Sequence, residues 1–185
     1  MKQITSAAAI ALFVSAFINV TPASAQRTNA DVRARELAAS FDKFKHVVKD
    51  KRGVRRDKYK DVRTEPVVRS NLQTLSGTYQ EAGWPFSLRL RVDQNGRVEG
   101  TGEDPVQDGV MRPFTIANGR VSGALLTGTK VYGNGAKEPL EGVFINRIVK
   151  ESPTDPGTTE FGLGMTGTFV YGGFSVERLF FPRVR

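Results

Sequence analysis

The chain has 185 residues, a net charge of +8 and no cysteine, which excludes disulfides and thiolate chemistry. Its single histidine, His46, lies in the basic N-terminal part, so a Ser-His-acid triad or a histidine metal site in the rest of the chain is excluded. We therefore expect a protein that is not an enzyme and uses no metal or cofactor, a hydrolase acting without histidine being the remaining enzymatic alternative.

Residues 1–25 have the features of a Sec-type signal peptide. Lys2 provides a positive start, residues 7–18 are an apolar run, and Ala23-Ser24-Ala25 fits a cleavage site. We expect cleavage near Ala25 and a periplasmic or extracellular protein. No later run reaches the ~20 apolar residues of a membrane-spanning helix, so no span is predicted.

Residues 26–66 are predicted to form a basic arm. Residues 27–63 contain thirteen Lys/Arg and six Asp/Glu, whereas residues 64–185 contain thirteen of each. Apolar residues at helical spacing predict an amphipathic helix that ends near Gly53, followed by a frayed helix or ordered linker over residues 54–63. The stripe is expected to pack on the body or on another copy, the alternative being a membrane-surface helix. It comprises Ala30, Ala34, Leu37, Phe41, Phe44 and Val48.

Positive charge is concentrated in the second half of the arm. Behind a signal peptide, such a patch would meet anionic lipid head groups or acidic envelope polymers, and the alternative is a merely solvated helix. The candidate residues for binding an anionic surface are Lys43, Lys45, Lys49, Lys51, Arg52, Arg55, Arg56, Lys58, Lys60 and Arg63.

After Pro66 the hydrophobic period changes from helical to that of strands. Residues 67–185 are predicted to form eight or nine short antiparallel strands in an up-and-down meander. Glycines recur inside these strands, as strongly coiled sheets require, so a closed barrel is favoured over a flat sheet. The fold class is thus mainly β, with an amphipathic basic helix in front.

Register arguments predict two hairpins in this meander. A three-residue loop ending at Gly96 pairs Val92 with Val98 on one face, which a two-residue loop would not do. Near the end of the chain, a two-residue turn at Gly172-Gly173 pairs Tyr171 with Phe174.

Turn residues predict the remaining connections. Asn118-Gly119 is expected to be a two-residue hairpin turn that pairs Ile116 with Val121, with strands following over residues 120–127 and 129–133. Gly133-Asn134-Gly135 is interpreted as the next turn, and Leu140 begins a long strand. Trp84 and Tyr132, at turns, either close an end of the barrel or are exposed recognition aromatics. Glu103, Asp104 and Asp108 carry oxygen ligands that could hold calcium, but their spacing does not match an EF-hand, so they are interpreted as an acidic surface loop.

The inward-facing residues of these strands are the candidates for lining the barrel. They either surround a ligand or fill the interior themselves. Arg178 either faces inward, over an aromatic ring such as Tyr79, or lies in water while Leu179 and Phe181 turn inward. The candidates are Tyr79, Phe86, Leu88, Leu90, Phe144, Phe169, Tyr171 and Arg178.

Residues 75–182 resemble the calycin group, the lipocalin-type and avidin-type barrels. The resemblance lies in Gly77-Thr78-Tyr79 near the first strand, in the meander, and in Arg178 in the last strand. Tyr79 stands at the position of the group's tryptophan, across which a late basic residue packs. The resemblance implies a barrel that holds a small apolar ligand.

Two functions follow from these observations. The first is a non-enzymatic secreted or periplasmic β-barrel that binds a small ligand or a partner surface. The alternative is a structural or adaptor protein of the envelope, whose barrel is filled and whose basic arm binds anionic surfaces.

Overall fold

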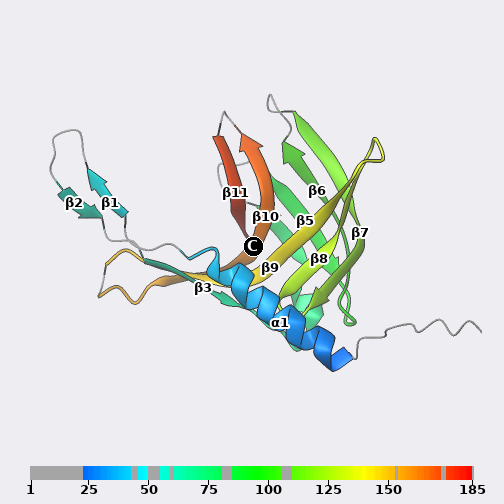
Figure 1. The fold of residues 1–185 in the computed structure, drawn as a ribbon, viewed down its shortest axis with the longest axis horizontal. Coiled ribbons are helices and arrows are strands. Elements are labelled where there is room, and N and C mark those ends of the chain that lie inside the picture. Colours follow the sequence, from blue (N-terminus) through cyan, green and yellow to red (C-terminus); the bar gives the residue numbers. More distant parts are fainter. Residues whose placement is uncertain are drawn as a thin grey trace, which may run out of the picture.

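The computed structural model describes residues 23–42, 46–49, 55–58, 61–80, 85–105, 110–152, 154–171 and 174–184 (Figure 1). Most of the predicted signal peptide and Trp84 lie outside these residues. The elements are α1 (Ala23–Ala39), β1 (His46–Lys49), β2 (Arg55–Lys58), β3 (Asp61–Pro66), the 3-10 helix η1 (Leu72–Leu75), β4 (Gly77–Gln80), β5 (Ser87–Val92), β6 (Arg97–Pro105), β7 (Met111–Ser122), β8 (Leu125–Tyr132), β9 (Lys137–Lys150), β10 (Thr158–Tyr171) and β11 (Phe174–Pro182).

Strands β4 to β11 form an antiparallel meander that is nearly closed into a barrel, which confirms the predicted fold class. Each strand pairs with its neighbours in sequence, in the order β11-β10-β9-β8-β7-β6-β5-β4. β9 is longer than β8, and β3 pairs with the part of β9 that β8 does not reach, from Asp61 opposite Lys150 to Pro66 opposite Ile145.

Arg183 joins the two ends of the meander. Its backbone forms a bridge with Tyr79 of β4, and the next residue, Val184, donates its N–H to the Thr78 carbonyl at 2.8 Å. The Arg183 guanidinium donates to the carbonyls of Thr74 at 2.9 Å and Ser76 at 2.7 Å. These contacts close the barrel at the end that lies away from the β8–β9 and β10–β11 turns.

Aromatic rings fill much of the interior. Near Arg183, Tyr79 packs against Phe144 and Phe161, with ring centroids 5.9 and 6.3 Å apart. Phe86 packs edge-on against Phe169 at 5.2 Å and Phe181 at 6.3 Å. Tilted and edge-on rings at these distances are favourable in themselves and also bury large apolar areas.

Both hairpins predicted from register are confirmed. Val92 pairs with Val98, and Gly96 has the positive φ, +77°, that the three-residue loop requires. Tyr171 pairs with Phe174, as the two-residue turn demands.

Helix α1 lies across the outside of the barrel, at the lower end in Figure 1. Ala34 and Leu37 are buried against an apolar patch of the outer face that includes Ile145 and Phe180, so the part of the stripe that lies on α1 packs on the body as expected. Arg33 donates from Nε and Nη2 to the two carboxylate oxygens of Glu141 in β9, at 2.9 and 2.7 Å. No helix in the described part of the chain is long and apolar enough to cross a membrane.

The prediction of a helix up to Gly53 was wrong, because α1 ends at Ala39. Residues 46–49 and 55–58 pair as the hairpin β1–β2, which lies apart from the barrel in Figure 1, and residues 61–66 form β3 instead of a linker. Thr64 of β3 donates its hydroxyl to the Ala38 carbonyl and its backbone N–H to Asp42 Oδ1, so β3 also contacts the end of the helix. Over residues 61–66, pairing with the length of β9 that β8 leaves free makes a strand, since tertiary contacts outweigh propensity.

The turn prediction at Asn118-Gly119 was wrong as well. β7 runs through these residues to Ser122, and the turn falls at Gly123-Ala124, so the strands predicted over 120–127 and 129–133 are replaced by the ends of β7 and β8. Asn118 has a φ of +53° where the β7–β8 register shifts, and a Cβ on Gly119 would lie 2.5 Å from the Val98 carbonyl oxygen. Asn-Gly therefore forms a bulge, which uses the same backbone freedom as a turn.

Arg178 is exposed and does not face the interior, whereas Leu179 and Phe181 are buried. The β10–β11 register shifts between Thr166 and Phe169, so the inward parity predicted from Phe174 does not hold along the whole strand. The alternative stated above, with Leu179 and Phe181 inward, is confirmed.

Candidate functional site

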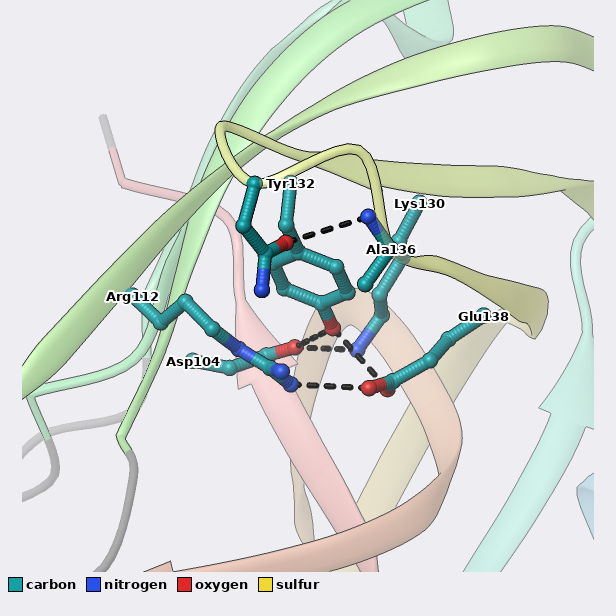
Figure 2. Close-up of polar contacts among 7 residues, drawn as sticks. Asp104, Arg112, Lys130, Tyr132, Ala136 and Glu138 are labelled. Carbon is teal, nitrogen blue, oxygen red and sulfur yellow. Dashed lines mark hydrogen bonds and ion pairs between the residues drawn. The ribbon is translucent and has the colours of Figure 1, made fainter.

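Five ionisable side chains meet inside one end of the barrel, and we call this cluster the polar mouth (Figure 2). They come from the ends of four successive strands, β6 to β9, at the end opposite to Arg183. The residues of the polar mouth are Asp104, Arg112, Lys130, Tyr132 and Glu138.

Strand alternation points these side chains inward. In β7, Arg112 shares parity with the buried Phe114 and Ile116, and in β8, Lys130 and Tyr132 share parity with the buried Leu126. The polar mouth thus continues the interior rows of the barrel, with charged groups in place of apolar ones.

The deepest part of the polar mouth is an ion pair between Lys130 and Asp104. The Lys130 Nζ lies 2.7 Å from Asp104 Oδ2, and the two side chains are only 10% and 15% exposed. The same ammonium lies 4.9 Å from the ring centre of Phe114 and 5.9 Å from that of Phe169, distances at which cation–π attraction operates.

A second ion pair lies nearer to the solvent. Arg112 Nη2 donates to Glu138 Oε1 at 2.8 Å, and these side chains are 34% and 46% exposed. The guanidinium also lies over the ring of Tyr132, 3.6 Å from its centre. Arg112 and Glu138 therefore form the outer rim, and Lys130 and Asp104 form the floor.

The Tyr132 hydroxyl connects the two ion pairs. It lies 2.7 Å from Asp104 Oδ2 and 2.9 Å from Glu138 Oε2 (Figure 2). Burial and the two carboxylates raise the pKa of Tyr132, so it remains a neutral donor at neutral pH. A hydroxyl carries one proton and can donate to only one of the two carboxylates at a time.

Glu138 is ionised in this arrangement. Burial raises the pKa of Glu138, but hydrogen bonds from Tyr132 and Arg112, together with nearby positive charge, outweigh it and hold the pKa below its ordinary value of 4.5. The polar mouth therefore combines charged and neutral donors with charged acceptors.

The predicted lumen residues lie deeper, and they pack on their neighbours. Tyr79, Phe86, Leu88, Leu90, Phe144 and Phe169 are each at most 3% exposed. Tyr171 is described only by its backbone, and Arg178 lies on the outside. A cleft of about 550 Å³ that crosses β4 to β8 lies on the outer face, because Thr101, Glu103 and Thr115 along it are exposed.

The predicted anion-binding residues lie only partly within the described residues. Lys49, Arg55, Arg56 and Lys58 belong to β1 and β2, and Arg63 is exposed on β3. Lys43, Lys45, Lys51, Arg52 and Lys60, like Phe44 of the stripe, lie outside the described residues.

The polar mouth was not predicted as a site from the sequence. Asp104 was interpreted as part of a surface loop, but residues 101–105 extend β6, and Asp104 is on its inward face. The signal that could have revealed the site is Lys130 two residues before Tyr132, since a lysine on the same face as an aromatic residue in a strand suggests a buried cation.

Comparison with known proteins gives no further indication of function. No family model matches this chain, and no curated protein or solved structure shows a match to it.

Proposed function

We propose that this chain is a non-enzymatic binding protein, exported to the periplasm or the cell exterior, whose barrel binds a small polar molecule at the polar mouth. The observation that carries the proposal is the Lys130–Asp104 ion pair at the ends of two inward-facing strands, with side chains only 10% and 15% exposed. Mouths of β-barrels are common sites for ligands, and an aqueous rim with convergent polar groups is what such sites require.

Energetics support a functional reason for this network. Burying an ion pair removes both charges from water, and well-packed apolar residues in the same place are often equally or more stabilising. Aromatic and aliphatic residues fill the rest of the interior, so apolar side chains could also have filled the positions of the ion pair. Charged groups at four strand ends are better explained by a ligand that they contact than by stability.

Because aromatic rings fill the interior, we expect the ligand to bind at the polar mouth and not in the lumen. The rings of Phe86 and Phe169, and those of Tyr79 and Phe144, contact each other in pairs. An apolar ligand in that position would have to displace them, whereas a polar ligand at the rim would displace only Arg112 and Glu138.

A calycin-type barrel is a further part of this proposal. The segment from η1 into β4 carries Tyr79, and Arg183 donates to two carbonyls of this segment, at Thr74 and Ser76. Arg183, and not Arg178, is thus the late basic residue that reaches the segment leading into the first strand.

Export and binding are tested separately. For export, the full chain is expressed in a bacterial host, and mass spectrometry determines the N-terminus of the protein in the periplasmic fraction. We expect a chain that begins near Gln26, and retention of residues 1–25 in the cytoplasm would contradict export.

For binding, ¹⁵N-labelled mature protein is screened by NMR against a mixed set of small polar molecules. We expect saturable shifts at the amides of Asp104, Arg112, Lys130, Tyr132 and Glu138. Shifts confined to the outer-face cleft near Thr101 and Thr115, or none at all, would contradict binding at the polar mouth.

A second candidate function is binding of anionic surfaces by the arm, and the register of β1–β2 favours it. Lys49 lies directly opposite Arg55 in this register, so two basic residues occupy one paired position of the hairpin. Like charges in directly opposite positions destabilise a hairpin, and an anionic partner removes that repulsion. Anionic lipid head groups or an acidic envelope polymer would be such a partner.

Charge substitutions, not truncation, test this second candidate, because removing the arm, residues 26–66, would also remove most of α1 and all of β3. We would compare the mature protein with its Lys49→Gln/Arg55→Gln/Arg56→Gln/Lys58→Gln variant on heparin and on anionic vesicles. We expect weaker retention of the variant, and weaker retention of both proteins as salt rises and the Debye length falls. Equal retention of the two proteins would rule the arm out.

A further inference from the structure

We infer that the polar mouth binds a neutral molecule with several hydroxyl groups, a sugar or polyol, and not a free ion. This inference rests on the proposed function and specifies the chemistry of its ligand.

The first argument is charge balance. Asp104 and Glu138 supply two negative charges, and Lys130 and Arg112 supply two positive ones, already paired at 2.7 and 2.8 Å. An incoming anion would displace a carboxylate from its cation, and an incoming cation would displace an ammonium or guanidinium from its carboxylate. The displaced group would then be an unpaired charge on the floor, where Lys130 is 10% exposed. Unpaired buried charge is strongly unfavourable, so the balanced site disfavours ionic ligands.

The second argument is the hydrogen-bond count around Tyr132. Its hydroxyl lies within hydrogen-bond distance of one oxygen of Asp104 and one of Glu138, but it has a single proton. With both carboxylates ionised, one of these two contacts lacks a hydrogen at any moment. A ligand that donates a hydrogen bond to either carboxylate relieves this shortage.

The third argument is that hydroxyl groups fit between the charged groups. A hydroxyl donates one hydrogen bond and accepts others, so it can donate to a carboxylate while it accepts from an ammonium or guanidinium. Lys130 has three N–H donors, and its contact with Asp104 uses one of them. Tyr132 itself shows that a hydroxyl is accommodated between Asp104 and Glu138. Adjacent hydroxyls on one molecule extend the same pattern without changing the charge.

NMR titration of the ¹⁵N-labelled mature protein tests the inference with four probes. Glucose and myo-inositol are neutral polyols, and glucuronate and glucosamine are their negatively and positively charged counterparts. We expect saturable shifts at the polar-mouth amides with at least one neutral polyol, and about tenfold weaker binding of the charged probes, the factor that corresponds to one lost hydrogen bond.

Variants on one strand provide the matched control. Asp104→Asn removes a carboxylate from the polar mouth and is expected to weaken polyol binding about tenfold. Glu103→Gln removes the neighbouring carboxylate, which is exposed on the other face, and is expected to leave binding unchanged. Glu138→Gln, at the more exposed rim, serves as a second test if Asp104→Asn unfolds the protein.

The outcomes separate this inference from the proposed function. Tighter binding of glucuronate or glucosamine than of the neutral polyols at the same amides would overturn the inference and leave a small-molecule site at the polar mouth. If none of the four probes binds but another small polar molecule of the screen shifts these amides, the inference is likewise overturned and the small-molecule site remains. Absence of any ligand that shifts these amides would overturn both.

Discussion

The two halves of the barrel interior are built on different physical principles. Near Arg183 the interior consists of rings such as Tyr79, Phe144 and Phe161, whose packing is stabilised mainly by the apolar area that it buries. At the polar mouth, Lys130 and Asp104 form a short, directional ion pair of 2.7 Å. The comparison suggests that the aromatic half stabilises the barrel, whereas the polar mouth contributes little net stability and serves recognition.

The largest expected effect is in the aromatic half. Phe144→Ala removes a fully buried ring that contacts Tyr79 and Phe161, and it should lower the free energy of unfolding by about 4 kcal/mol, because the surroundings cannot fill the cavity. Urea denaturation measures the change. Val68→Ala, at a position 67% exposed, is the control and should stay within about 0.5 kcal/mol of wild type. A loss at Phe144 as small as that at Val68 would refute the role of this half.

The next effect sharpens the comparison at the polar mouth. Lys130→Met leaves Asp104 without its ammonium and should cost about 3 kcal/mol, because a mostly buried charge loses its partner. The double variant Lys130→Met/Asp104→Leu removes both charges and should recover most of that loss. Chemical denaturation of wild type, the single variant and the double variant measures these changes in unfolding free energy. A double variant no more stable than Lys130→Met would show that the ion pair is itself a major source of stability.

A smaller effect compares two tyrosine hydroxyls, one in each half. Tyr132→Phe keeps the ring under Arg112 but removes the hydroxyl between Asp104 and Glu138, and Tyr79→Phe removes a hydroxyl that donates to the Leu75 carbonyl. We expect each to cost about 1 kcal/mol in unfolding free energy. Only Tyr132→Phe should also change the NMR shifts caused by a ligand, and equal changes in both variants would argue against the division of roles.

The smallest effect is the pH dependence that Glu138 contributes. Its pKa is lower in the folded protein than its ordinary value of 4.5, so its stabilising contribution is complete above that value and is lost as the pH falls through the folded-state pKa. Glu138→Gln should therefore flatten the acid side of the stability–pH curve below about pH 4.5 and leave its shape at neutral pH unchanged. Parallel curves for wild type and variant would contradict the assigned contacts.

Elements whose pattern and turn chemistry agree were predictable from sequence. Strand β5 alternates cleanly, and its loop must place Val92 and Val98 on one face, so register could be worked out without the structure. The aromatic candidates, Phe86 and Phe144 among them, are buried as the period of two predicts. In these segments, local and long-range preferences point to the same answer.

The remaining features depend on partners that are distant in sequence. Asn118-Gly119 supports a turn or a bulge equally well, and only the pairing with β6 and β8 decides between them. β3 is a strand because β9 extends past β8, which no local signal in residues 54–66 reveals. The polar mouth could not be assembled because Asp104 and Lys130 are 26 residues apart, and their meeting depends on the register of three strands.

The contacts of Arg183 also have a consequence for how the chain folds. Its guanidinium reaches carbonyls 107 and 109 positions earlier in the sequence, so the seam between first and last strands forms most readily after the hairpins between them have paired. Such long-range contacts cost conformational entropy on loop closure before they contribute any favourable energy, and they slow folding. Until that step, the edges of β4 and β11 remain open to other chains. Arg183→Gln should therefore lengthen this vulnerable stage and increase aggregation during refolding more than it lowers the stability of the finished barrel.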